Sequence, residues 1–148
     1  MKGFSAFPRR AEGCDYGSMK LLPFILLIVA GVLVCYGYSA LTGPIAPNVR
    51  VWWTGMVGPF VVAAVALLLI RILSAKGHNW VTTAGSIYAI GVSVMGMLIA
   101  GVLFGGRSNV GQNHSDYGLL FVGLWGITLP IALILVGLAI WQRVRKSR

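Results

Sequence analysis

The chain alternates long apolar runs with short polar stretches. Four of the runs are long enough to cross a hydrocarbon core of about 30 Å as helices that rise about 1.5 Å per residue. We predict membrane-spanning helices at roughly 21–42, 56–74, 86–104 and 119–141. These runs contain no acidic residue, and Arg71, near the end of the second run, is their only charge. The pattern is typical of an all-α, polytopic membrane protein.

The polar stretches between the runs predict how the helices are arranged. The connections at about 43–55 and 75–85 are both short. Short connections make neighbouring helices adjacent and antiparallel. We therefore expect one four-helix transmembrane bundle over 21–141, made of two antiparallel hairpins and flanked by an N-terminal arm at 1–20 and a basic tail at 142–148.

Basic residues indicate the orientation of this bundle. If both termini are cytoplasmic, all of the 12 Lys and Arg side chains except Arg50 and Arg107 are cytoplasmic. Such a positive-inside bias predicts an N-in/C-in topology. It also explains the net charge of +9 without a nucleic-acid partner.

Composition supports lipid as the main solvent of the chain. Of its 148 residues 57% are apolar and only 10% are charged, and the mean hydropathy is +0.85. A soluble domain of this size needs far more charge to cover its surface. We expect a multi-pass protein, with a bacterial inner membrane as the favoured location.

The first run has an alternative interpretation as a cleaved signal peptide. It begins with the basic residue Lys20 and ends in small residues near Ala40, after which cleavage would occur. However, Tyr38 is bulky for the position that determines cleavage, and a long arm precedes the run. We therefore favour a retained membrane anchor.

Small residues on the last two runs predict where helices pack, because close backbone approach drives helix association in lipid. On the third run, one face carries Ala89, Ser93, Gly96 and Ala100, and a neighbouring face carries Gly101 and Gly105. On the fourth run, Gly123, Gly126 and Gly137 share a side with Pro130, where a missing backbone donor favours a kink. The two faces of the third run predict the most central helix, or one that also contacts another copy.

The chemistry that the sequence lacks narrows the function. The acidic residues Glu12, Asp15 and Asp116 all fall outside the four runs, so no span offers the carboxylate common in ion-coupled transporters. His78 and His114 are expected on opposite sides of the membrane, which excludes a bis-histidine haem within one chain. We expect no enzyme activity and no cofactor.

One polar stretch, 105–118, collects group types that are used in catalysis. Its His114, Ser115 and Asp116 are consecutive in a turn-rich segment, whereas a catalytic triad requires converging side chains. His114 and Asp116 are possible metal ligands, but two ligands without a third bind a metal ion only weakly. We interpret Arg107, His114 and Asp116 as parts of an external contact loop.

These observations predict a small non-enzymatic membrane protein. We expect an accessory, assembly or structural subunit of a membrane complex, or a homo-oligomer, whose partners are lipids and other membrane subunits or copies of itself. One alternative is an oligomeric transporter or channel for a neutral or anionic solute, lined by Pro130 beside Ser93 and Thr128. Another is a membrane immunity protein that inhibits a pore-forming toxin.

Overall fold

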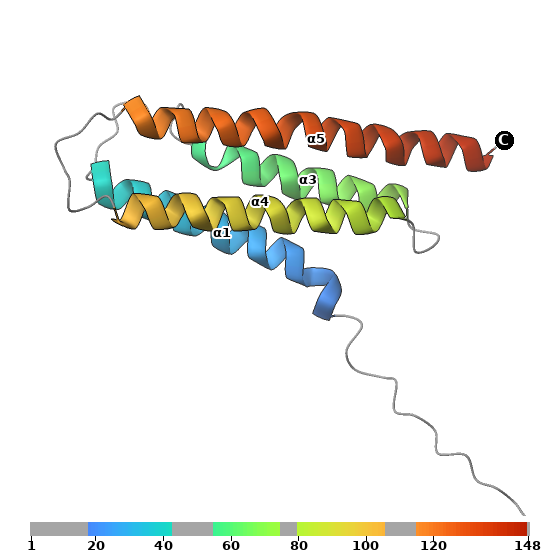
Figure 1. Ribbon diagram of the computed structural model, residues 1–148. Helices are drawn as coiled ribbons and strands as arrows, with labels where there is room; N and C mark the ends of the chain where they lie inside the picture. Colours follow the sequence, from blue (N-terminus) through green and yellow to red (C-terminus); the bar gives the residue numbers. More distant parts are fainter. Residues whose placement is uncertain (1–17, 43–54, 75–79, 106–114, 148) are drawn as a thin grey trace, which may run out of the picture.

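The computed structural model describes residues 18–42, 55–74, 80–105 and 115–147, and these residues are helical apart from short turns. The helices are α1 (Ser18–Thr42), α3 (Gly58–Leu73), α4 (Trp80–Gly105) and α5 (Ser115–Ser147). Figure 1 shows them as one elongated bundle. The prediction of an all-α protein is confirmed.

Three of the helices are long and apolar enough to cross a membrane: α1, α4 and α5. The fourth, α3, has 16 residues. At about 1.5 Å per residue it extends about 24 Å, which is shorter than a typical hydrocarbon core of about 30 Å. The length of α3 therefore does not confirm the predicted full span at 56–74. Pro59 stands at its first turn, and the backbone N–H of Ser74 bonds to the carbonyl oxygen of Ile70 (2.9 Å) where it ends.

The outer surface of the bundle is apolar. Ile28 on α1, Ile87 on α4 and Leu133 on α5 each expose about two-thirds of their surface (65%, 65% and 66%). Many other large aliphatic side chains on all four helices are also exposed. Soluble monomers do not expose apolar surface on this scale, whereas lipid solvates it without cost. These helices therefore belong to a membrane protein.

Three helices extend beyond their predicted ends, α1 by the three residues from Ser18 and the other two by more. The helix α4 begins at Trp80 rather than at 86, and the Ser86 hydroxyl donates to the carbonyl oxygen of Thr82 (3.0 Å). Hydroxyls that bond to their own helix in this way allow polar residues to remain helical in lipid. The helix α5 continues to Ser147 and includes most of the predicted tail at 142–148. Arg145 and Lys146 occupy its last turn, where cations stabilise a helix.

Consecutive helices alternate in direction (Figure 1). The most extensive contacts nevertheless join helices that are not neighbours in the sequence, because α1 packs along α4 and α3 packs along α5. The two pairs meet mainly where α3 contacts α4, and also where α4 contacts α5 and α1 contacts α3. Two separate hairpins are therefore not evident from the packing, and this arrangement stays a prediction.

Three helices converge closely at Gly96 on α4. A Cβ atom added at Gly96 would lie 2.6 Å from the Phe60 ring of α3 and 3.3 Å from the Cβ of Ala30 on α1. Both neighbours are buried. The missing side chain of Gly96 is thus what allows the Phe60 ring to enter between α1 and α4.

A second close contact joins the start of α3 to α5. The Trp125 ring of α5 lies directly over Gly58, so that a Cβ there would overlap it, with Cη2 at 2.9 Å. The indole Nε1 of Trp125 donates a hydrogen bond to the carbonyl oxygen of Gly55 (3.2 Å). A tryptophan ring and a glycine together fix where α3 begins relative to α5.

Candidate interaction surfaces

Three buried hydroxyl groups on α4 and α5 donate to backbone carbonyls. The Tyr88 hydroxyl of α4 donates to the carbonyl oxygen of Thr128 on α5 (2.8 Å). The hydroxyls of Thr128 and Ser93 donate to carbonyl oxygens of their own helices, those of Leu124 (2.6 Å) and Ala89 (2.8 Å). Ser93 and Thr128 are fully buried. The Tyr88 bond joins α4 to α5, and each of the three hydroxyl groups already donates its proton.

The small-residue face predicted on the third run lies inside the bundle. Ala89, Ser93, Gly96 and Ala100 are all buried. Gly96 receives Phe60 of α3, as described above, and the carbonyl oxygen of Ala100 approaches Gly37 of α1. The helix α4 contacts all three other helices.

The other predicted packing glycines lie on the outside. Around Gly101 and Gly105 of α4, and around Gly123, Gly126 and Gly137 of α5, an added Cβ would meet no neighbouring helix within 4 Å. These glycines make no close contact with another described helix of the same chain, so their role in helix packing stays a prediction. The spacing of small residues identifies a helix face but not the partner of that face.

The helix α5 buries its other side. Its buried residues are three large apolar side chains, two alanines and one threonine: Phe121, Leu124, Leu135, Ala132, Ala139 and Thr128. Pro130 is exposed among the glycines, and α5 continues as one helix through it. We call the exposed side with Gly123, Gly126, Pro130 and Gly137 the α5 glycine face.

The transport path of the alternative hypothesis would be built by oligomerisation, and a single copy of the chain does not test it. Ser93 and Thr128 are buried, and their hydroxyls bond to their own helices. Pro130 lies on the exposed side of α5. The three residues therefore do not line a common channel inside one copy.

The predicted external contact loop lies mostly outside the described residues. Arg107 and His114 belong to the stretch that the structure does not describe. Asp116 falls within the first turn of α5, which begins at Ser115 rather than at 119. Across the described helices, no three His, Cys, Asp or Glu residues lie close enough to hold a metal ion.

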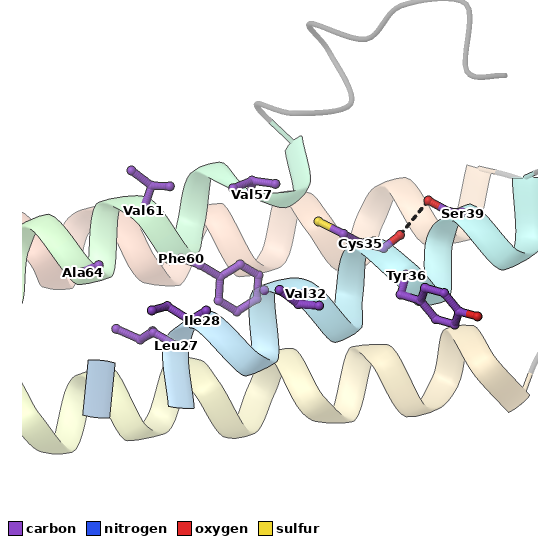
Figure 2. A pocket seen from close by; sticks show the side chains of 11 residues that line it. Leu27, Ile28, Val32, Cys35, Tyr36, Ser39, Val57, Phe60, Val61 and Ala64 are labelled. Carbon is purple, nitrogen blue, oxygen red and sulfur yellow. Dashed lines mark hydrogen bonds between the residues drawn. The ribbon is translucent and has the colours of Figure 1, made fainter. Parts of the chain in front are cut away.

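A groove lies between α1 and α3, and it was not predicted from the sequence. Its volume is about 520 Å³, and its walls are almost entirely apolar. Figure 2 shows Leu27, Ile28 and Val32 of α1 and Phe60 of α3 around it, with Cys35 and Ser39 toward one end. A run of apolar residues carries no signal for such a groove, because it depends on how far two helices diverge.

Arg71 bridges α1 and α3 beyond the apolar end of this groove. Its guanidinium carbon lies 4.9 Å from the centre of the Phe24 ring. Stacking of this kind is a cation–π interaction, which is stronger where water is scarce. Arg71 therefore contacts α1 as well as lying near the end of α3.

Comparison with known proteins identifies no relative, because no family model, curated protein or solved structure matches the chain.

Proposed function

We propose that the protein is a non-enzymatic subunit of a membrane assembly. It acts as an accessory, assembly or structural component of a larger complex, or as a homo-oligomer. Both termini are cytoplasmic, the four helices cross the membrane as two antiparallel hairpins, and the membrane is a bacterial inner membrane. The shorter α3 is accommodated by local thinning of the bilayer around it.

One observation carries this proposal, the contrast between two groups of glycines. Gly58 and Gly96 are each required by a neighbouring aromatic ring. Gly123, Gly126 and Gly137 are exposed, and a Cβ would fit at each of them without contact. On the α5 glycine face, no contact among the described helices makes use of the small size of these glycines. Close approach of a helix from another chain would use it.

The other observations are consistent with a role in contact rather than catalysis. The distribution of Lys and Arg supports the proposed orientation, since only Arg50 and Arg107 would be external. The four apolar runs lack carboxylates, and the hydroxyls of Tyr88, Ser93 and Thr128 are bonded to backbone oxygens.

The mass of the protein after extraction in mild detergent tests this function. We expect a particle larger than one 15.8 kDa chain plus its detergent, containing further copies or other membrane subunits. The double variant Gly123→Leu/Gly126→Leu should yield the single chain, because two leucines prevent close approach of a helix to the α5 glycine face.

The matched control is Gly91→Leu, which changes an exposed glycine of α4 that also has open space around it. It should leave the large particle intact. A stable wild-type monomer without partners would contradict the proposed function. Loss of assembly in Gly91→Leu alone would show that α5 is not the contact.

A further inference from the structure

Exposed aromatic side chains mark both edges of the apolar surface of the bundle. Trp80 begins α4 and Trp141 lies near the end of α5, and both are largely exposed (60% and 57%). At the opposite edge, Tyr36 of α1 packs against Phe104 of α4, with ring centres 5.9 Å apart. From Trp80 to Phe104, α4 rises about 36 Å, slightly more than a hydrocarbon core of about 30 Å. The two aromatic levels therefore correspond to the two interfaces, where tryptophan and tyrosine are favoured.

Packing contacts place Trp141 at the depth of Trp80. The contacts that fix this depth are two glycines under larger side chains of neighbouring helices: Gly85 under Ile70, and Gly58 under Trp125. The helices α3 and α5 run in the same direction, and α4 runs opposite to both (Figure 1). Counted at about 1.5 Å per residue from these contacts, Trp80 lies about 26 Å and Trp141 about 24 Å beyond the start of α3. Both tryptophans therefore lie at one interface.

The last turns of α5 project beyond this interface (Figure 1). Residues 142–147 remain helical and extend about 9 Å past Trp141. Arg143, Arg145 and Lys146 are all exposed there. A bilayer of about 40–45 Å around a core of about 30 Å leaves roughly 5–8 Å for the headgroups of each leaflet. The three cations therefore lie at the depth of the headgroups.

No carboxylate within the described helices lies near these cations. The one acidic residue that the structure describes, Asp116, is in the first turn of α5, about 40 Å away along the helix. Arg145 does contact Trp141, with its guanidinium carbon 5.5 Å from the ring centre. Such stacking uses the face of the guanidinium and leaves its N–H donors for an anion. The charge of this surface is therefore complementary to an anionic group at the interface.

We propose that the end of α5, with Arg143, Arg145 and Lys146, binds the headgroups of anionic phospholipids in the leaflet that faces the C-terminus. An acidic protein would meet the same charges, but the depth of the cations beside Trp141 favours lipid. Each cation near an anionic surface strengthens binding about fivefold. The site lies beyond the α5 glycine face, so each proposal can fail while the other holds.

Photolabelling with two headgroup probes tests this site. The full-length protein is reconstituted into phosphatidylcholine vesicles with a trace of phosphatidylglycerol or phosphatidylcholine that carries a diazirine in its headgroup. Both leaflets contain the probe, so the orientation of the protein does not affect the result. We expect the phosphatidylglycerol probe to label residues 141–147 at least about tenfold more than the phosphatidylcholine probe. Sodium phosphate should compete no better than sodium chloride of equal ionic strength.

Two triple variants with the same change in net charge provide a matched comparison. Arg143→Gln/Arg145→Gln/Lys146→Gln should remove the preference for phosphatidylglycerol, because its three charges are lost. The control replaces three basic residues of the N-terminal arm by glutamine instead: Lys2, Arg9 and Arg10. The control should keep the preference within about twofold, because the end of α5 is unchanged. Arg143→Lys/Arg145→Lys should also keep it, since the charge is retained.

Three results would overturn the proposal. Equal labelling of residues 141–147 by the two probes would show that charge does not select the lipid there. Equal losses in the two triple variants would assign the preference to net charge rather than to the end of α5. Selective competition by phosphate would identify a free anion as the ligand. The comparison of the two probes on the wild-type protein decides the question even if a variant does not fold.

Discussion

Replacement of Gly96 by valine is expected to destabilise the bundle by about 2–3 kcal/mol. The new side chain would overlap the Phe60 ring and press on Ala30, so that contacts of α4 with both α3 and α1 are disturbed. Overpacking of a well-packed core typically costs 1–3 kcal/mol. The change from glycine to valine offsets little of this loss through helix propensity. In lipid, α4 must satisfy its backbone as a helix whichever residue is present. Unfolding in mixed detergent and SDS micelles measures the loss.

The control for Gly96→Val is Gly91→Val on the same helix. Within the part of the chain that the structure describes, a Cβ at Gly91 meets no atom within 4 Å. The free energy of unfolding of the Gly91→Val protein should stay within about 0.5 kcal/mol of the wild-type value, as for most surface substitutions. Equal losses in the two variants would mean that the approach of Phe60 to α4 is not specific.

The second large effect is expected from Gly58→Ala at the start of α3. Its added methyl group would overlap the Trp125 ring. Moving this ring also breaks the hydrogen bond from Nε1 to the carbonyl oxygen of Gly55. We expect a loss of about 1–3 kcal/mol, measured by the same unfolding experiment. Gly55→Ala is the control, because a Cβ there meets no atom of the described residues within 4 Å.

A double-mutant cycle shows whether this loss comes from the ring itself. Trp125→Phe shortens the side chain and also removes its indole donor. In the Trp125→Phe background, Gly58→Ala should cost at least about 1 kcal/mol less than in the wild-type protein, since contacting residues couple by about 0.5–3 kcal/mol. Additive losses would contradict direct contact between Gly58 and Trp125.

The positions of the helices were predictable from sequence because lipid imposes one simple requirement. A membrane-spanning segment must be apolar and must satisfy its own backbone, so apolar runs located α1, α4 and α5. The ends were less predictable. Ser86 bonds to its own helix, and the basic residues near Arg145 are good helix formers, so polarity alone did not mark where α4 begins or α5 ends.

The partners of the helices were not predictable in the same way. Gly96 and Gly101 both belong to small-residue patterns on α4, yet one is buried and the other is exposed. Nothing local distinguishes them, because the difference arises from Phe60 on another helix. The groove has the same origin, since it reflects the separation of α1 from α3 rather than any residue pattern.

Site-specific photo-crosslinking in native membranes tests the assembly role most directly. A benzophenone amino acid is placed at Leu133 or Ile134, which flank the α5 glycine face, or at Leu68 of α3, all of which are exposed. We expect protein adducts of one defined mass from the two α5 positions and only lipid adducts from Leu68. Lipid adducts alone from all three positions, or the same protein adducts from all three, would contradict the assembly role.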